Sequence, residues 1–143
     1  MYLPVEMSPL EDKQVRKIHK LCYPGAVSRP HNWYFVHPTL VVRGTDLRVL
    51  GYTSFTITLI PGFGQTLYGM DVCVHPEYRG KGIARTLHAA RLALAYECGA
   101  RIFMGTVHAS NKNMARVLES TGAHACLPIL DEILYVGPIT EVS

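Results

Sequence analysis

The sequence predicts a mixed α/β fold in which a single-domain chain, residues 1–143, forms a central β-sheet flanked by helices. A length of 143 residues is typical of one domain with a substantial core. Hydrophobic residues make up 48% of the chain and charged residues 17%, which argues against disorder. Strand and helix patterns alternate in the order β-α-β-β-β-α-β-α-β-β, and such alternation predicts a layered sheet with helices on it.

The N-terminal part predicts a strand, a helix and then an aromatic loop. Residues 3–7 suit a short strand, and Ser8, Pro9 and Glu11 form a capping-box pattern with proline at the first helical position. The apolar residues that follow at helical spacing are Val15, Ile18, Leu21 and Cys22. Pro24-Gly25 ends this helix. The loop that follows, residues 24–38, combines three prolines with Trp33, Tyr34 and Phe35 and has room for a short helical turn.

Three strands are predicted next, over residues 39–42, 49–60 and 65–74. Alternating polar and apolar residues in the second strand, and the turn residues 61–64 after it, support this assignment. The end of the third strand, Met70–Val74, is largely apolar, as expected for a central strand that is buried on both faces.

The clearest helix is predicted over residues 83–97, with Gly99 as its C-terminal stop. Its predicted apolar stripe consists of Ile83, Leu87, Ala90, Leu94 and Cys98. A strand over 101–107 follows, and residues 66–107 therefore predict a parallel strand pair with a right-handed crossover.

The C-terminal part predicts a helix and two final strands. The helix covers residues 111–121 and is closed by Gly122. The strands cover 123–127 and 132–136, on either side of Pro128.

Composition excludes several functional classes. The net charge is +3 and no Lys/Arg block is present, so no nucleic-acid partner is expected. No apolar run approaches the ~20 residues of a membrane span, and the N-terminus lacks a signal-peptide pattern. The seven histidines lack zinc-site spacing, so no metal is expected. The four cysteines form no CxxC pair and predict buried free thiols in a reducing compartment. These features together predict a cytoplasmic protein.

The most informative segment, Val74–Ala84, joins a predicted strand to the predicted helix over 83–97. N–H groups at a helix start are unpaired, and the helix dipole adds about half a positive charge there. Gly80 and Gly82 allow a phosphate to approach the backbone closely, and Arg79 and Lys81 add positive charge. The segment therefore predicts a site for a phosphate-bearing cofactor. The alternative is that the glycines form only a tight turn and the cations are ordinary solvated charges.

Three phosphate-binding patterns compete for this segment. The P-loop pattern GxxxxGK[ST] is absent, and the dinucleotide pattern GxGxxG fails because Arg85 occupies its third glycine position. The third pattern, Arg/Gln-x-x-Gly-x-Gly/Ala, is matched throughout by residues 79–84.

This match, in this strand order, resembles the GNAT superfamily of acyl-CoA-dependent N-acetyltransferases, and the resemblance implies a GNAT-like fold. It is strongest over residues 66–124, where the preceding Val-x-Pro-Glu-Tyr run also fits. The family's second signature, an Asn followed eleven residues later by a Gly, is met by Asn111 and Gly122. Asn111 also suits an ordinary helix N-cap, and the two roles are compatible.

The resemblance implies acetyl-CoA (coenzyme A) as the cofactor. Backbone N–H groups of Gly80 to Ala84 would hold its pyrophosphate, and the strand ending at Val74 would pair with the pantetheine arm. In the family this strand and the next splay apart, which leaves backbone donors free to polarise the thioester. The implied cofactor-binding residues are Val72, Cys73, Val74, Arg79, Gly80, Lys81, Gly82, Ile83, Ala84 and Asn111.

The family's usual catalytic side chains are absent from their usual positions. The common Glu position falls on Tyr68, a second base position on Met70, and the thiol-protonating Tyr position on Leu118. The candidate catalytic residues near the expected cleft are therefore Tyr68, Asp71, His75 and His108, with Tyr135 as a substitute tyrosine. Each histidine also suits a merely exposed or structural role, and transfer could rely on positioning with little acid–base help.

The sequence hypothesis is an N-acetyltransferase that moves an acetyl group from acetyl-CoA to a primary amine. The acceptor, a protein amine or a small amino compound, is expected beside residues 31–35 and 61–65, and a homodimer is an option from the resemblance. The alternative is a catalytically silent acyl-CoA-binding or protein-interaction module with the same fold. A nucleotide-binding oxidoreductase, the third class, would prefer a dinucleotide to coenzyme A.

Overall fold

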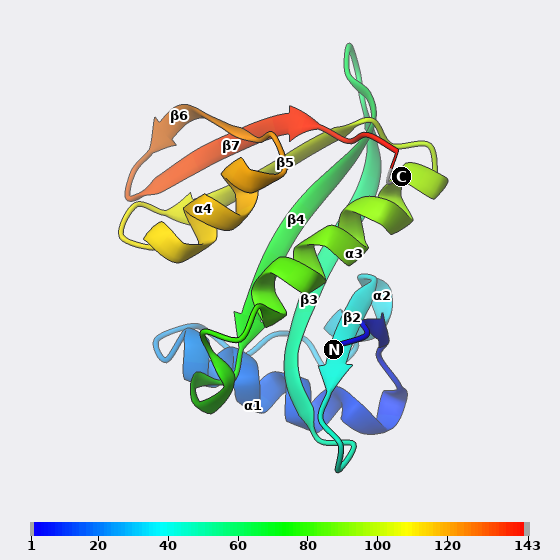
Figure 1. The fold of residues 1–143 in the computed structure, drawn as a ribbon, viewed down its shortest axis with the longest axis vertical. Helices are drawn as coiled ribbons and strands as arrows, with labels where there is room; N and C mark the ends of the chain where they lie inside the picture. Colours follow the sequence, from blue (N-terminus) through cyan, green and yellow to red (C-terminus); the bar gives the residue numbers. More distant parts are fainter. Residues whose placement is uncertain (1, 142–143) are drawn as a thin grey trace. The chain divides into compact units, whose positions relative to one another are not determined.

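The computed structural model describes residues 2–141 and shows a mixed α/β fold with a seven-stranded sheet (Figure 1). The strand order is β1-β2-β3-β4-β5-β7-β6. The elements are β1 (Val5–Glu6), a 3-10 turn (Pro9–Glu11), α1 (Asp12–Cys22), α2 (Trp33–Val36), β2 (Thr39–Arg43), β3 (Val49–Ile60), β4 (Gly64–Val74), a second 3-10 turn (Pro76–Tyr78), α3 (Ile83–Glu97), β5 (Ile102–His108), α4 (Lys112–Ser120), β6 (His124–Ile129) and β7 (Glu132–Pro138). The predicted order of strands and helices is therefore confirmed, and α3 has the predicted bounds.

The described residues fall into two compact units. Unit 1 contains the chain up to Ser54 together with Asp71–Leu87, and unit 2 contains Phe55–Met70 and the chain from His88 onward. Strands β3 and β4 and helix α3 each contribute residues to both units. Each unit is described by itself below.

Unit 1 has an apolar layer on each face of its part of the sheet. On one face Val15 and Ile18 of α1 belong to a buried cluster with Val41, Tyr52 and Cys73. On the other face Ile83 and Leu87 of α3 cluster with Val42, Leu50 and Val74. Successive strand residues point to opposite faces, so the pairs Val41/Val42 and Cys73/Val74 place α1 and the start of α3 on opposite sides of these strands.

The predicted capping box is present, and it starts the 3-10 turn that leads into α1, which begins at Asp12. The Ser8 hydroxyl accepts a hydrogen bond from the Leu10 N–H, and Glu11 accepts one from the Ser8 N–H at 2.8 Å, which completes the capping box. Arg43 donates two further bonds to Glu11. Val15 and Ile18 are buried as predicted, whereas Leu21 is 42% exposed and lies outside the apolar face.

Unit 2 contains the parallel pair that the sequence predicts. Strand β4 pairs in parallel with β5 from Thr66↔Ile102 to Gly69↔Gly105, and β5 and β6 each pair antiparallel with β7. Gly137 in β7 is required by close packing. A side-chain carbon at this position would lie 2.6 Å from the Ala123 Cα, and the neighbouring atoms are backbone.

The predicted apolar stripe of α3 is correct at its start and wrong at its end. Leu94 is 39% exposed and Cys98 is exposed, whereas His88, Arg91 and Ala95 are buried. The polar residues are hydrogen-bonded inside the core: the Arg91 Nε donates to the His88 Nδ1 at 2.9 Å, and the His88 Nε2 lies 3.1 Å from the Thr121 hydroxyl. Burial and the nearby Arg91 charge lower the pKa of His88 to about 2, so this imidazole is neutral.

Two further predictions need correction. The turn between the last two strands lies at Leu130–Asp131, with Leu130 at φ 56°, and Pro128 lies inside β6. Proline is tolerated there because β6 is an edge strand, whose outward N–H groups have no ladder partner to lose. Of the four free cysteines only Cys73 is buried, while Cys98 and Cys126 are exposed.

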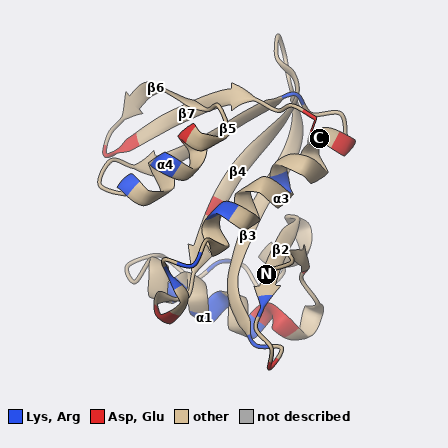
Figure 2. Cartoon of the chain, in the orientation of Figure 1, with Lys and Arg blue, Asp and Glu red and all other residues tan. Residues whose placement is uncertain are grey.

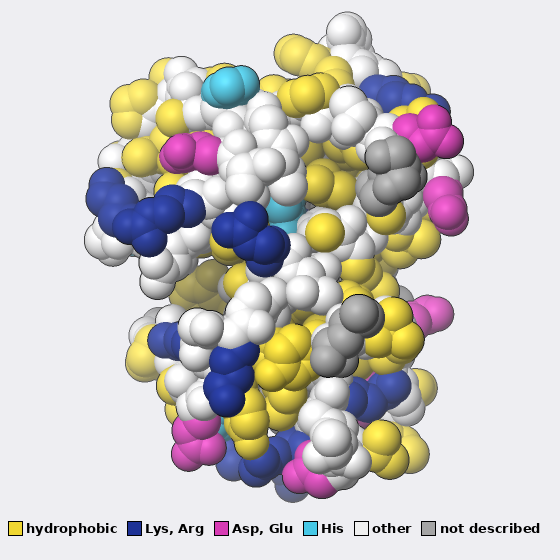
Figure 3. All heavy atoms as spheres, viewed as in Figure 1, with side chains coloured by type: hydrophobic (Ala, Val, Ile, Leu, Met, Phe, Trp, Pro, Cys, Tyr) yellow, Lys and Arg dark blue, Asp and Glu magenta, His cyan; other side chains and the backbone are white. Residues whose placement is uncertain are grey.

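No helix among the described residues is long and apolar enough to cross a membrane. On the face drawn in Figure 3, Lys and Arg side chains are interspersed with apolar and uncharged ones.

Candidate cofactor loop and active site

The segment between β4 and α3 has the backbone geometry that its glycines predict. Gly80 and Gly82 adopt φ +79° and +81°, which are left-handed conformations that other residues rarely adopt. No described atom lies within 4 Å of the position where a side-chain carbon would sit on either glycine. These glycines are therefore selected by backbone conformation and leave an open space in front of the loop.

The start of α3 presents unpaired donors at this loop. The Thr86 N–H donates to the Gly82 carbonyl at 3.0 Å, so the helical hydrogen-bond ladder begins at Gly82. The N–H groups in the first turn precede that ladder and have no partner inside the helix. Ile83 is buried and anchors the turn, while Gly80, Lys81 and Gly82 are exposed. This arrangement suits an anion, because the dipole of α3 and its unpaired N–H groups both favour negative charge at the start of the helix.

Cations surround the loop within unit 1, and Figure 2 marks the basic residues before α3 and in its first turn. The Arg79 Nε donates to the Val74 carbonyl at 3.0 Å, which ties the guanidinium to the end of β4. Lys81 lies 6.0 Å from the centre of the Tyr78 ring, and Arg48 donates a hydrogen bond to the hydroxyl of the same tyrosine. The positive charge at this loop is therefore held by specific contacts.

The end of β4 places its residues on alternate sides. Val72 and Val74 pack with the cluster under the start of α3, while Cys73 packs with the cluster under α1. The Val74 carbonyl accepts from Arg79 and also from the Cys22 thiol, at a sulfur–oxygen distance of 3.7 Å.

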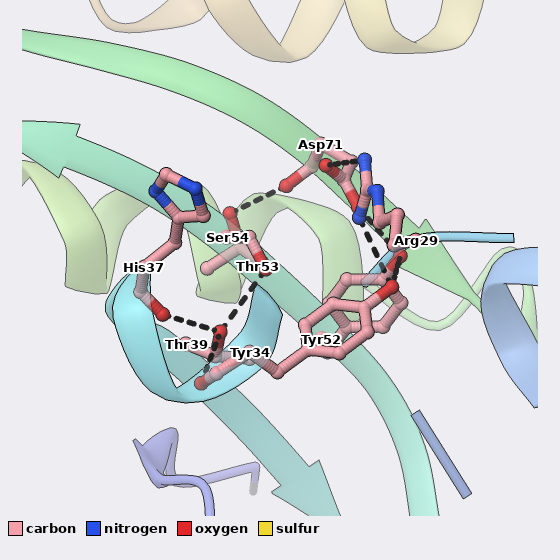
Figure 4. Close-up of polar contacts among 8 residues, drawn as sticks. All are labelled: Arg29, Tyr34, His37, Thr39, Tyr52, Thr53, Ser54 and Asp71. Atoms are coloured by element: carbon pink, nitrogen blue, oxygen red, sulfur yellow. Dashed lines mark hydrogen bonds and ion pairs between the residues drawn. The ribbon is translucent and has the colours of Figure 1, made fainter. Parts of the chain in front are cut away.

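Asp71 lies in a buried polar network, drawn in Figure 4. Its carboxylate is paired bidentately with Arg29, with both nitrogen–oxygen distances 2.9 Å, and it accepts the Tyr52 hydroxyl at 2.5 Å. The Asp71 side chain is 1% exposed. The Arg29–Asp71 pair raises the pKa of Arg29 despite its partial burial, so the guanidinium stays charged. Burial and neighbouring charges raise the pKa of Tyr52, which therefore remains a donor to Asp71.

The same network fixes the aromatic loop between α1 and β2. The Arg29 guanidinium also bonds the Tyr34 hydroxyl at 3.0 Å and lies 4.5 Å from the Trp33 ring centre. Tyr34 is buried, Trp33 is half-buried, and Phe35 is 52% exposed. Tyr34 is thus the core anchor of this loop.

His75 has its Nδ1 atom engaged. It caps the second 3-10 turn by accepting a hydrogen bond from the Glu77 N–H at 3.2 Å, and its ring packs edge-on against Tyr78. A neutral imidazole has one acceptor nitrogen. Because that nitrogen is Nδ1 here, the proton of the neutral ring resides on Nε2.

His108 and Asn111, in unit 2, build the turn before α4. The His108 Nδ1 accepts from the Ser110 N–H at 3.1 Å, and its Nε2 lies 3.3 Å from an Asp131 carboxylate oxygen. The Asn111 side-chain oxygen accepts from the Met114 N–H at 3.1 Å, so the predicted N-cap is present. Asn111 is exposed, which leaves its amide nitrogen accessible.

The other catalytic candidates of unit 2 differ in accessibility. Tyr68 is 36% exposed on β4. Leu118 is fully buried in α4 and so supplies apolar packing where the resemblance would place a tyrosine. Tyr135 is buried, and its hydroxyl lies 3.5 Å from a Glu119 carboxylate oxygen. Burial and that carboxylate both raise the pKa of Tyr135.

Comparison with models of protein families identifies the family of this chain. A model of the acetyltransferase (GNAT) family matches residues 13–123. The chain belongs to the GNAT family. The matched region includes the loop of Gly80 and Gly82 and the N-cap Asn111. No curated protein sequence matches the chain significantly.

Solved GNAT-fold structures match over nearly their whole length. Salmonella typhimurium yncA, solved with its cofactor acetyl-CoA, has a TM-score of 0.80 at 21% identity, covering 99% of this chain and 96% of its own. The ribosomal-protein-S18-alanine N-acetyltransferase of Escherichia coli gives 0.78 at 14%, covering 100% and 97%. Arabidopsis thaliana NAA60, in complex with a bisubstrate analogue, gives 0.79 at 17%, covering 99% and 100%. At these identities the likeness establishes the shared fold.

Sequence reasoning missed the partners of Asp71. Arg29 and Tyr52 lie 42 and 19 residues from it along the chain, so no local spacing connects them. One signal was available. An aspartate in an otherwise apolar central strand requires a cationic or donor partner, because burying an unpaired carboxylate is too costly.

Proposed function

We propose that this chain, acting as one domain, is an N-acetyltransferase that transfers the acetyl group of acetyl-CoA to a primary amine. The acceptor classes are a protein amine, either a lysine or an N-terminus, and a small amino compound. The cofactor loop, Arg79 to Ala84, would hold the pyrophosphate, and Val72 to Val74 would lie along the pantetheine arm. Asn111 would contact that arm through its free amide.

The observation that carries the proposal is the open, left-handed loop at the start of α3. Gly80 and Gly82 have room in front of them, unpaired helical N–H groups lie beside them, and Arg79 and Lys81 supply positive charge. Family membership and the acetyl-CoA bound to the yncA structure support the same assignment. The registered pairing of β4 with β5 ends at Gly69, whereas β4 itself continues to Val74. This supports backbone pairing of the later residues with a cofactor.

The decisive variant is Gly82→Asp, compared with Gly82→Ala. Both introduce a side chain at φ +81°, which costs about 1–3 kcal/mol of backbone strain, but only Asp brings a negative charge to the pyrophosphate. We expect Gly82→Asp to weaken acetyl-CoA binding in calorimetry at least tenfold more than Gly82→Ala. Equal affinities of the two variants would remove the loop from the cofactor site.

Side-chain geometry favours transfer that depends on positioning. Asp71 has both oxygens occupied by Arg29 and Tyr52, and it therefore serves as a structural anion rather than a base. His75 and His108 use Nδ1 as a turn acceptor, so neither has a free acceptor nitrogen in its neutral form. We infer that the acceptor amine enters already deprotonated and that backbone donors polarise the thioester. Positioning of this kind can supply several kcal/mol of the barrier.

The pH dependence of the rate tests this mechanism. We expect the pH–rate profile to follow the pKa of the acceptor amine, and His75→Ala to leave its midpoint in place. A midpoint that moves with His75→Ala would make His75 the base. Tyr68→Phe is the matched test for the exposed tyrosine of β4.

A second candidate is a silent acyl-CoA-binding module. The specific observation in its favour is Leu118, which is buried and apolar where the family often has an acid. A mass-spectrometric screen of amine acceptors with acetyl-CoA separates the two. Acetylated product supports the enzyme, while binding without product for any acceptor supports the module.

A further inference from the structure

Two thiols and one guanidinium lie between α1 and β4 in unit 1, and no step of the proposed acetyl transfer uses either thiol group. Cys22 is the last residue of α1, and Cys73 is the penultimate residue of β4. The Arg79 Nη2 donates to the Cys22 sulfur at 3.4 Å, and the Cys22 thiol donates to the Val74 carbonyl at 3.7 Å. Three chain segments therefore converge on one half-buried sulfur atom.

We infer that Cys22 is a modification site, a thiolate stabilised by Cys73 and Arg79 that hydroperoxides oxidise to a sulfenic acid. In this step the thiolate sulfur attacks one peroxide oxygen and the O–O bond breaks. The leaving alkoxide or hydroxide takes a proton from water. The sulfur loses two electrons and the peroxide gains them, so a hydroperoxide is the only co-reactant required.

The charge balance around Cys22 favours the thiolate. The Cys73 thiol donates to the anion, the Arg79 charge adds to this, and together they outweigh burial and bring the pKa of Cys22 to about 7. Burial, the bond to Cys22 and the Asp71 charge keep the pKa of Cys73 high, so it remains a donor. The pKa of Tyr23, next to Cys22, is raised by burial, so that phenol is neutral. Arg79 is the cation that meets the sulfur directly.

The chain provides its own reference thiols. Cys98 and Cys126 are exposed. At pH 7 a thiol with a pKa near 7 is about half ionised, against about 1% for a pKa of 9. The thiolate of the more acidic thiol is a weaker nucleophile, which reduces this advantage in thiolate fraction by roughly tenfold. The reaction rate is then about five- to tenfold higher, before differences in the solvent accessibility of the sulfur are considered. The accessibility of the sulfur changes the rate of modification but not the pH at which the rate is half-maximal. This pH midpoint is therefore a better test of thiol acidity than the rate itself.

The experiment is alkylation of the folded protein with iodoacetamide over pH 5.5–10, with each cysteine quantified by peptide mass spectrometry. We expect a midpoint near pH 7 for Cys22. Arg79→Met should raise the Cys22 midpoint, and Arg79→Lys should restore part of the shift. Circular dichroism checks that both variants are folded. A Cys22 midpoint that Arg79→Met leaves in place would overturn the inference.

Oxidation is tested on the same protein with a limiting amount of hydrogen peroxide in the presence of dimedone. The expected result is a dimedone adduct predominantly on Cys22, which is lost in Cys22→Ser while the adducts on Cys98 and Cys126 are unchanged. Adducts confined to Cys98 and Cys126 would also overturn the inference. Neither measurement involves coenzyme A, so the outcome does not depend on the proposed function.

Discussion

Removal of Arg29 is expected to be among the most damaging single changes outside the apolar core. In Arg29→Met the Asp71 carboxylate loses two charge-assisted hydrogen bonds of 2.9 Å and keeps only the Tyr52 hydroxyl. The Asp71 side chain is 1% exposed, so water does not replace the lost partner. Breaking a buried ion pair in this way costs about 3–5 kcal/mol, because one charge is left without compensation.

The measurement is urea unfolding followed by circular dichroism. For a chain of this size a slope near 2 kcal/mol per molar urea converts the loss into a midpoint shift of about 2 M. The double variant Arg29→Met/Asp71→Leu removes both charges and should recover most of the stability, leaving a loss of about 1–3 kcal/mol for the Tyr52 hydroxyl. Asp131→Asn removes an exposed partner of His108 and serves as a surface control, with an expected change below about 1 kcal/mol.

Two results would refute the reasoning. If Arg29→Met shifted the midpoint no more than the Asp131→Asn control, the pair would not be buried in solution. If the double variant were less stable than Arg29→Met, the loss would come from packing of the arginine stem against Trp33 rather than from an uncompensated charge.

Two further predictions concern unit 2. The pKa of His88 is about 2 in the folded protein and about 6.5 in the unfolded chain, so only the unfolded chain gains a proton at this site as the pH falls below 6.5. The free energy of unfolding should therefore drop by about 2 kcal/mol between pH 6.5 and 5, in addition to the effect of other titrating groups. Urea unfolding measured at each pH should show this slope in the wild type and lose it in His88→Gln. Gly137→Ala should destabilise by about 3 kcal/mol or more, because the added carbon meets Ala123 backbone at 2.6 Å, whereas Gly25→Ala, with no described atom within 4 Å, should change the thermal midpoint little; similar midpoints for both would contradict the packing argument.

Local signals explain what the sequence predicted well. The capping box at Ser8 and the stop at Gly99 depend on residues a few positions apart, and the structure confirms both ends. The loop before α3 was equally predictable, since Gly80 and Gly82 report a backbone conformation that each glycine adopts by itself. Such features need no knowledge of the rest of the fold.

Features that depend on distant partners were not predictable in the same way. The buried face of α3 contains His88 and Arg91, which hydropathy assigns to the surface. Inside the core Arg91 donates to His88, and the other His88 ring nitrogen contacts Thr121, 33 residues away in the chain. Asp71 was proposed as a catalytic candidate because it is acidic at a strand end, but its partner Arg29 is supplied by a loop far away in sequence. The pattern of apolar residues alone carries no information on such pairs.

The same distinction bears on the chemistry of the candidate site. The proposed phosphate recognition at the start of α3 would use backbone N–H groups, so it would depend on conformation and would tolerate any side chain at most positions. A general base requires a particular lone pair that faces the acceptor. His75 and His108 both commit the Nδ1 lone pair to a backbone N–H in their own turn, which fixes the tautomer and makes the remaining nitrogen a donor. A base would therefore require one of these turns to open, and at His75 opening would remove the cap of the adjoining 3-10 turn. For this reason we expect the pKa and the positioning of the acceptor amine, rather than a histidine of this chain, to determine how fast the amine is acetylated.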